Sequence, residues 1–192
     1  MTNITAACDR ASRLVTDLLE LSRVTRSDLR RRNVDLSTLA AAVAEELRTA
    51  DPGRTCTLVV QPGMVASGDE ALIRVVLANL VGNAWKFTSK KADAHIEVGV
   101  EEGPEGPVFF VRDDGVGFES ARASELFAPF RRLHRQADFP GTGVGLAIVQ
   151  RAIRRHGGRV WVESSPGRGA TFRFTLPPPD TSGPSERDGA TP

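Results

Sequence analysis

Three polar side chains, Asn79, Asn83 and Lys86, stand at positions i, i+4 and i+7 of a segment, NLVGNAWKF, that has the pattern of a helix. They continue a line that begins with the apolar residues Leu72 and Val76. Burying two amides and an ammonium is costly unless something pairs with them. A carboxamide oxygen suits Mg²⁺ and a lysine suits phosphate, so a bound phosphate ligand is one interpretation and a solvated polar edge is the other.

A second motif, DDGVG at residues 113–117, follows an apolar run with the pattern of a strand. Gly115 and Gly117 permit a sharp turn and let a flat ligand approach the backbone. Asp113 can accept a hydrogen bond from an exocyclic amine. Taken alone, the motif favours an ordinary tight turn with a surface acid.

A third motif, GTGVGL at residues 141–146, opens a predicted helix, where backbone N–H groups can bind an anion. No strand precedes Gly141, so a Rossmann dinucleotide site is excluded. No Gly-Lys-Ser/Thr sequence follows, so a phosphate-binding P-loop is excluded as well. The remaining simple alternative is a flexible hinge before a helix.

In this order and spacing, the three motifs resemble the N, G1 and G2 boxes of the GHKL ATP-binding family. More closely, residues 4–177 resemble the catalytic domain of phytochrome-type and PAS-linked sensor histidine kinases. LFAPFRRLH is similar to the F box of these kinases, and HGGRVWVESSPGRGATFRFTLP to their closing strands. The resemblance implies an α/β (α+β) two-layer sandwich, the Bergerat/GHKL fold, with a mixed sheet, helices on one face and a long helix before it.

The resemblance also implies that the ligands are ATP and Mg²⁺. Asn83 would ligate the Mg²⁺, Asn79 would support it, and Lys86 would neutralise phosphate charge. Arg132 of the F box would reach the γ-phosphate and act with Lys86 in catalysis. The phosphates would be held by the whole third motif, Gly141, Thr142, Gly143, Val144, Gly145 and Leu146.

At the adenine, Asp113 would accept from the amino group, while Gly115 and Gly117 would let the base lie against the turn. Ala170 stands where the wider superfamily often has Thr or Ser, so one side-chain contact with the base is in question. Thr171 is a possible replacement for that contact.

The stretch from Phe118 to Pro140 would be the ATP lid, which we expect to order when nucleotide binds. Phe127 and Phe130 are predicted to latch it. Arg131 stands where relatives often carry Gln or an aromatic residue, which makes this lid more basic.

Residues 3–32 have a heptad pattern that predicts a long helix with a seam of Ile4, Ala7, Ala11, Leu14, Leu18, Leu21 and Thr25. This helix resembles only the second helix of the kinase dimerisation hairpin. None of His95, His134 and His156 lies in a phosphoacceptor motif such as His-Glu-Leu-Arg-x-Pro. We therefore expect a kinase fragment or truncated kinase that dimerises through this helix and cannot label itself. It would phosphorylate a histidine on another helix, from which a response regulator would receive the phosphoryl group.

The predicted organisation is a remnant dimerisation helix at 1–34, a catalytic domain at 35–177 and a disordered tail rich in Pro, Gly and Ser at 178–192. The formal net charge of +1 implies no bulk attraction to nucleic acid or anionic membrane. No run of apolar residues is long enough to span a bilayer, and Cys8 and Cys56 match no metal spacing, so a cytoplasmic protein is predicted.

Three other function classes compete with the kinase. A GHKL ATPase or regulatory module would use ATP without phosphorylating histidine, but such hydrolases usually carry Glu as a base where this chain has Asn79. A pure binding partner would dock its first helix into another kinase. An anti-sigma-type serine kinase fits less well with the LLELSRV helix and the phytochrome-like lid.

Overall fold

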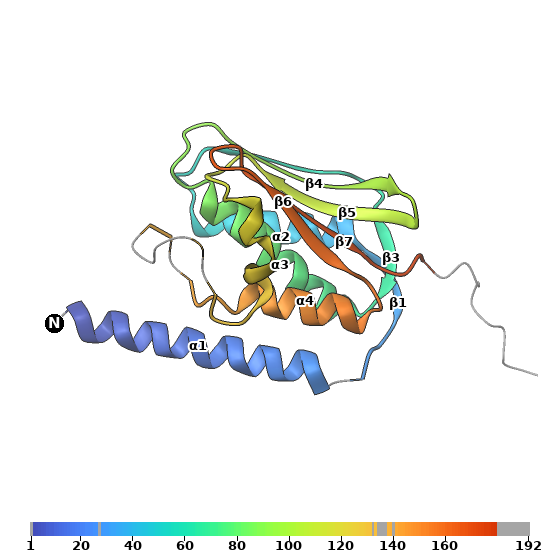
Figure 1. Cartoon of the computed structure of the whole chain (residues 1–192), viewed down its shortest axis with the longest axis horizontal. Helices are drawn as coiled ribbons and strands as arrows, with labels where there is room; N and C mark the ends of the chain where they lie inside the picture. The colour runs from blue at the N-terminus through green and yellow to red at the C-terminus, as the bar shows by residue number, and fades with distance from the viewer. Residues whose placement is uncertain (1, 27, 132, 134–137, 140, 180–192) are drawn as a thin grey trace, which may run out of the picture.

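The computed structural model describes residues 2–26, 28–131, 133, 138–139 and 141–179, apart from the side chains of 2–10, 13, 26 and 124. A five-stranded mixed sheet has the order β2 (Cys56–Val60), β4 (Ala94–Gly103), β5 (Gly106–Asp113), β7 (Ala170–Thr175) and β6 (Val160–Ser164). Only the β2–β4 pairing is parallel. Helices α2 (Leu36–Ala50), α3 (Glu70–Phe87) and α4 (Gly145–Arg155) cover one face of the sheet (Figure 1). The predicted two-layer sandwich is confirmed.

Asp69 caps the start of helix α3, because its side chain accepts a hydrogen bond from the Leu72 amide at 3.1 Å. Its other end is fixed by Arg54, whose guanidinium donates to Thr88 Oγ1 at 2.6 Å. The buried face of the helix consists of Leu72, Ile73, Val76, Leu77, Leu80, Val81, Ala84 and Trp85. With that face against the sheet, the polar line that begins at Asn79 lies along the edge nearest α4.

Strands β5 and β7 alternate between the two faces of the sheet. Phe109 and Phe174 point toward the helices and stack with ring centroids 5.5 Å apart. Asp113 continues the same side at the end of β5, so strand periodicity places a carboxylate at the margin of the core. The opposite face carries both apolar and charged side chains: Arg112 pairs there with Glu97 at 3.0 Å and lies 4.8 Å from the centroid of the Phe110 ring.

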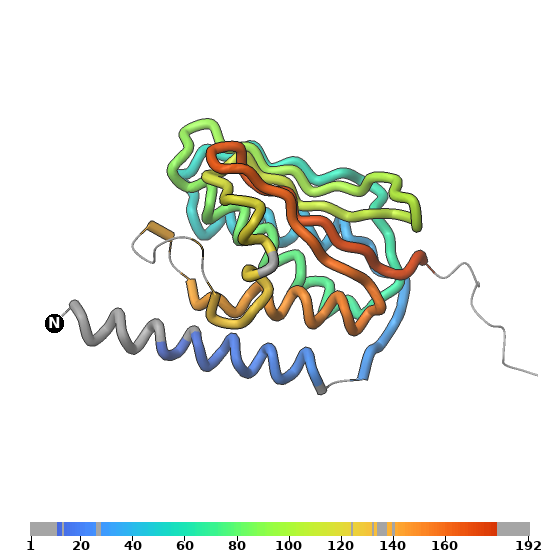
Figure 2. The backbone as a smooth tube through the Cα atoms, viewed as in Figure 1, coloured from blue at the N-terminus to red at the C-terminus, as the bar shows by residue number. Residues whose placement is uncertain are grey.

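Helix α1 (Thr2–Arg26) lies along α4 on the outside of the helical layer (Figures 1 and 2). Val24 is only 1% exposed and Leu21 packs against the core. Leu18, which the predicted seam groups with Leu21, is 47% exposed instead. The helix is confirmed, but its described seam residues do not all face the same way, because the domain covers the Leu21 side.

Three elements were not predicted. Strand β1 (Arg32–Asp35) pairs with β3 (Val65–Gly68) in a separate two-stranded sheet, and a 3₁₀ helix, η1 (Ser120–Phe127), lies inside the predicted lid. Asp35, the last residue of β1, also caps α2, because its side chain accepts a hydrogen bond from the Thr38 amide. Within the described residues, no helix has the length and apolarity needed to cross a bilayer. Most of the predicted tail, residues 180–192, lies outside the described residues.

Candidate functional site

One cavity brings the three sequence motifs together where α3, the end of β5 and the start of α4 meet. The predicted site residues that line it are Asn79, Asn83, Lys86, Asp113, Gly117, Gly141, Thr142, Gly143, Gly145 and Leu146. Gly115 and Val144 do not line it, although both stand next to residues that do. Arg132 lies outside the described residues.

The polar end of the cavity is formed by Asn83 and Lys86, one turn apart on α3. Lys86 Nζ donates to Asn83 Oδ1 at 3.0 Å and lies 4.3 Å from the centroid of the Phe87 ring. The same ammonium is close to Gly141, where an added Cβ would come within 3.4 Å of Nζ. A hard oxygen ligand and a cation therefore face the loop that leads into α4.

Asn79 is held in place from two sides. Its Nδ2 donates to the Val75 carbonyl at 2.9 Å, one turn earlier in α3. Its Oδ1 lies against Gly145, the first residue of α4. Asn79 thus joins the two helices that flank the cavity, and its amide has no proton-accepting role comparable to that of a carboxylate.

Asp113 is a buried acid, 5% exposed, whose Oδ1 accepts a hydrogen bond from the Gly115 amide at 2.9 Å. Burial raises the pKa of Asp113 to about 6 in spite of backbone hydrogen bonds that oppose the shift. A buried carboxyl in a cavity with so perturbed a pKa is typical of a functional group. The arrangement supplies a hydrogen-bond acceptor at the apolar end of the cavity.

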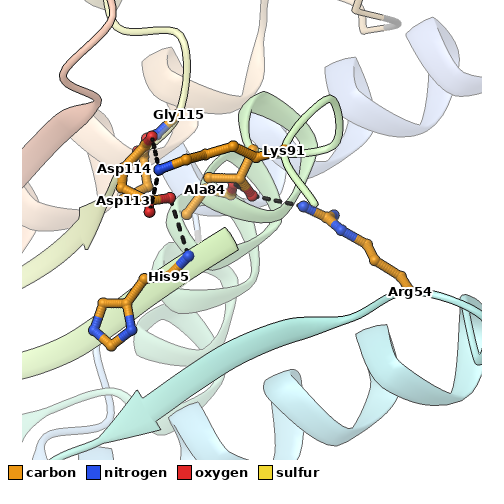
Figure 3. Close-up of polar contacts among 8 residues, drawn as sticks. Arg54, Ala84, Lys91, His95, Asp113, Asp114 and Gly115 are labelled. Carbon is orange, nitrogen blue, oxygen red and sulfur yellow. Dashed lines mark hydrogen bonds and ion pairs between the residues drawn. The ribbon is translucent and has the colours of Figure 1, made fainter. Parts of the chain in front are cut away.

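The turn after Asp113 is fixed by close backbone packing. An added Cβ on Gly115 would lie 2.5 Å from the Phe87 carbonyl oxygen, and Gly117 has a φ of +58°. Asp114 points the other way and accepts from Lys91 Nζ at 2.5 Å and from the His95 amide at 3.0 Å (Figure 3). Gly115 therefore serves the packing of the turn, and of the two glycines only Gly117 lines the cavity.

Strand alternation decides the question about Ala170 and Thr171. Ala170 and Phe172 line the cavity, whereas Thr171 lines a separate depression on the other face of the sheet. Thr171 therefore does not replace the hydroxyl contact that Ala170 cannot make.

The described part of the predicted lid contacts the cavity through residues that the sequence did not single out. Phe139 is 4% exposed and packs on Phe87, with ring centroids 5.1 Å apart and an interplanar angle of 57°. Phe130 has a φ of +64° and a side chain that is 58% exposed, and it contacts the glycine loop through its backbone N–H, which donates to the Gly143 carbonyl at 2.9 Å. Phe127 is partly buried at the end of η1. Arg131, the predicted departure from the family, lines the cavity.

Helix α1 contributes Asp17 to the cavity wall, which no sequence motif indicated. The Asp17 carboxylate accepts a hydrogen bond from Thr142 Oγ1 across 125 positions of sequence. A single acid on a charged helix resembles any solvated residue, so no local signal marks it. The other lining residues that sequence reasoning missed are Phe87, Val116, Phe118, Leu126, Leu133, Phe139 and Phe172.

The chain is similar to known proteins over the residues that form this cavity. Residues 68–180 match the family model described as histidine kinase-, DNA gyrase B-, and HSP90-like ATPase. The chain is 36% identical over 171 residues to cyanobacterial phytochrome B of Nostoc sp., covering 87% of this chain and 22% of that protein. It is also 36% identical over 171 residues to the adaptive-response sensory kinase SasA of a Synechococcus strain, covering 85% and 45% of the two chains.

Among solved structures, full-length ShkA in complex with AMPPNP is similar, with a TM-score of 0.69 and 32% identity, covering 85% of this chain and 35% of that one. The chain thus spans less than half the length of these relatives. The Bergerat/GHKL fold and the resemblance to histidine kinase catalytic domains are confirmed, and the family match supports ATP as the ligand. The chain belongs to the family of histidine kinase-, DNA gyrase B- and HSP90-like ATPases.

Proposed function

We propose that this chain is the ATP-binding catalytic part of a sensor histidine kinase, and that it transfers the γ-phosphoryl group of ATP to a histidine on another helix. The observation that carries the proposal is the single cavity lined by Asn83 and Lys86 of α3, Asp113 of β5 and the glycine loop before α4. The cavity has a hydrogen-bond acceptor, the Asp113 carboxylate, at one end, and the Lys86 ammonium and the backbone N–H groups of the glycine loop at the other. Phosphoryl transfer depends mainly on such positioning and charge stabilisation.

At the adenine end, we assign Asp113 as the acceptor of the exocyclic amine. Phe172 and Phe139 line the same cavity and supply apolar surface for the base. Gly117 lines the cavity, so we propose that the base lies against it, while its positive φ and the nearby Ser165 carbonyl require glycine there for packing as well.

At the phosphate end, Lys86 and the backbone of Gly141, Gly143 and Gly145 would hold the phosphates, with Thr142, Val144 and Leu146 completing the loop. The lid adds positive charge there. Arg131 lines the cavity, so we propose that it contacts the γ-phosphate alongside or in place of Arg132.

We propose that Mg²⁺ is bound by Asn83 and the phosphates together. The donor chemistry fits, because the Asn83 amide oxygen is a hard ligand and Mg²⁺ is usually held by one or two protein oxygens plus phosphates. In the described residues, no group of three His, Cys, Asp or Glu side chains could hold a metal alone. Bound there, Mg²⁺ would neutralise phosphate charge, while Lys86 keeps Asn83 oriented through their 3.0 Å hydrogen bond.

The acceptor histidine must come from elsewhere. His156 is 1% exposed and both its ring nitrogens face backbone groups. His95 is exposed but lines the depression on the opposite face of the sheet. His134 lies outside the described residues, in the lid. We propose a helix of a kinase dimer as the phosphoacceptor and a response regulator as the next recipient.

Helix α1 would be the second helix of the dimerisation hairpin, followed by the catalytic domain at 35–177. Its outward side carries Val15, Leu18 and Leu19, which are 56%, 47% and 55% exposed. Apolar side chains gathered on one exposed helix face indicate a partner. We propose that this partner is a second copy of the chain and that the protein works in the cytoplasm.

The test is transfer in trans. The chain is incubated with γ-labelled ATP and Mg²⁺, alone and with a helical-bundle domain that carries the acceptor histidine. We expect acid-labile label on the added domain and none on the chain itself. The variant Asn83→Ala should abolish labelling while Asp28→Asn, an exposed change after α1, leaves it intact.

A GHKL ATPase is the second candidate, and hydrolysis distinguishes it. The position usually occupied by a base holds Asn79, whose amide is engaged with Val75 and Gly145. We therefore expect negligible release of phosphate without an acceptor. Steady hydrolysis, or acid-stable label on the chain alone, would contradict the kinase proposal.

A further inference from the structure

We propose that docking of α1 and binding of nucleotide phosphates oppose each other, because Asp17 of α1 presents its carboxylate to the phosphate end of the cavity. This inference rests on the proposed function, in which the loop of Gly141 to Gly145 receives the phosphates. Asp17 lines the cavity and accepts a hydrogen bond from Thr142 Oγ1. The acid thus lies against the loop that is to receive an anion.

The position of Asp17 is set by the packing of α1. Leu21 and Val24 follow it at i+4 and i+7, on the same side of the helix, and both pack against the core. Arg155 of α4 donates to the Val24 carbonyl and fixes the same end of the helix. As long as these contacts hold, the carboxylate stays at the mouth of the cavity.

The surroundings of Asp17 contain a second acid. Glu20, one turn later, is partly buried, and this burial raises its pKa, with the nearby charge of Asp17 adding to the effect. Asp17 lines the cavity and Glu20 adds a second, partly buried carboxyl group one turn away on the same helix, with Arg23 as a neighbour that partly offsets it. Like charges in a partly buried site repel strongly because little water screens them.

Phosphates and Asp17 would also compete for the same partners. Lys86, Arg131 and Thr142 all line this cavity, and Asp17 already engages the Thr142 hydroxyl. A ligand with more phosphates has more to gain from these groups and more repulsion from Asp17. Adenosine, which has neither interaction, should be indifferent to the helix.

Linkage makes the effect reciprocal: if docked α1 weakens ATP binding, then ATP weakens the docking of α1 by the same factor. Release of α1 would uncover Leu21 and Val24 next to the exposed Leu18. The nucleotide would thereby control how much apolar surface this helix offers to a dimer partner.

The first test measures the affinities of Mg-ATP, Mg-ADP and adenosine by calorimetry for the wild type and Asp17→Asn. We expect about tenfold tighter ATP binding in the variant, within the usual 5–150-fold range of coupling, a smaller gain for ADP and no change for adenosine. Asp28→Asn is the matched control, because it removes the same charge from an exposed position outside the cavity.

The second test loosens the helix without touching the cavity. Val24→Asp should undock α1 and give the same gain in ATP affinity, and combining it with Asp17→Asn should add nothing further. In the wild type, ATP should speed amide exchange in residues 11–26, whereas adenosine should not.

Three outcomes would overturn the inference. Equal ATP affinity in wild type, Asp17→Asn and Asp28→Asn would show that Asp17 does not repel the phosphates. Weaker ATP binding by Asp17→Asn would show that the carboxylate assists binding, for example through Mg²⁺. If none of these proteins binds ATP, the proposed function is refuted as well. If only Asp17→Asn or Val24→Asp binds ATP, the inference is supported.

Discussion

The side-chain oxygen of Asn79 occupies the space that a Cβ atom on Gly145 would need, with 2.3 Å between Asn79 Oδ1 and the ideal Cβ position. The amide cannot turn away freely, because its Nδ2 donates to the Val75 carbonyl at 2.9 Å. Residue 145 must therefore be glycine because Asn79 leaves no space for a side chain. Its φ is not positive, so the backbone conformation alone would not require glycine. Two motifs that are far apart in the sequence form one packing unit at the cavity wall.

The first prediction is that Gly145→Ala destabilises the protein and weakens ATP binding. The added methyl must displace Asn79 or the first turn of α4, and overpacking of this kind costs about 1–3 kcal/mol. Chemical denaturation gives the stability, and calorimetry with Mg-ATP gives the affinity. We expect both to fall together, because the displaced turn carries the loop for the phosphates.

The double variant Asn79→Ala/Gly145→Ala tests the cause. Removing the amide restores space, so the double variant should be more stable than Gly145→Ala alone by about 1 kcal/mol. Gly82→Ala is the control on α3, since nothing lies within 4 Å of its added Cβ and the change should stabilise the helix by about 0.5–1 kcal/mol. Additive effects of the two changes would show that Asn79 and Gly145 do not interact.

The second prediction concerns pH and Asp113. Burial raises the pKa of this carboxyl from 3.8 to about 6, so the folded protein holds a proton there between these values while the unfolded chain does not. The stability contribution of Asp113 is therefore fully present below pH 3.8 and is lost as pH rises through 6. Asp113→Asn should stabilise the nucleotide-free protein at pH 7.5, on the order of 1–3 kcal/mol.

Binding should show the opposite dependence. An ionised carboxylate is the stronger acceptor for the adenine amine, so ATP affinity should fall as pH drops from 7 to 5. Asp113→Asn should bind ATP at least tenfold more weakly than wild type at pH 7. Its ATP affinity should also change less between pH 7 and 5, because the variant lacks the carboxylate that is protonated in this range. Asp114→Asn should keep that dependence, with its midpoint slightly lower, because Asp114 adds to the raised pKa of Asp113. Identical pH profiles in wild type and Asp113→Asn would refute the assignment.

Periodicity predicted much of this fold. The apolar line of Leu72 and Val76 predicted α3, the apolar run before Asp113 predicted β5, and the heptad pattern of 3–32 predicted α1. The resemblance to the GHKL family implied that the three motifs bind one ligand, and residues of all three line one cavity. Strands β1 and β3 were missed since each has only four residues, too few for a periodic signal.

Tertiary contacts outside the motifs could not be predicted in this way. The apolar residues of α1 show that the helix needs partners, but not that Leu21 and Val24 face α4 while Leu18 faces outward. The lid contains several phenylalanines, and the sequence does not tell which of them is buried. Asp17 reached the cavity only because α1 docks, which is a property of the whole domain.

The third prediction concerns His156, which is buried and bridges α4 and the start of α3. Its Nε2 accepts from the Asp69 amide at 2.9 Å, and its Nδ1 faces the Ala152 carbonyl at 2.8 Å, an arrangement that suits the neutral ring with the proton on Nδ1. Burial lowers the pKa of His156, with Arg31 and Arg155 adding to the effect while Asp69 and the Ala152 carbonyl oppose it.

Because the folded pKa lies below 6.5, the contribution of His156 is fully present above pH 6.5 and is lost as pH falls toward the lowered folded value. Below pH 6.5 the His156 contribution to the free energy of unfolding should therefore fall, by at most about 1.4 kcal/mol per pH unit, while the contribution of Asp113 changes in the opposite direction below pH 6. His156→Gln should be less stable at pH 8 and should show a shallower acid dependence between pH 6.5 and 5. His95→Gln, a change at an exposed histidine, should leave the wild-type slope unchanged, and a wild-type slope in His156→Gln would contradict the prediction.

The fourth prediction compares two phenylalanines of the lid. Phe139 packs on Phe87, and Lys90, in the turn after α3, holds the same segment through a 2.7 Å ion pair with Asp138 and lies 4.9 Å from the centroid of the Phe139 ring. Phe139→Ala should weaken ATP and ADP binding by about tenfold and make the lid easier to cleave by protease, because this anchor is lost. Phe130→Ala should leave both measurements near wild type, since the Phe130 side chain is 58% exposed. A larger loss from Phe130→Ala than from Phe139→Ala would show that the lid is held by Phe130, as the family pattern first suggested.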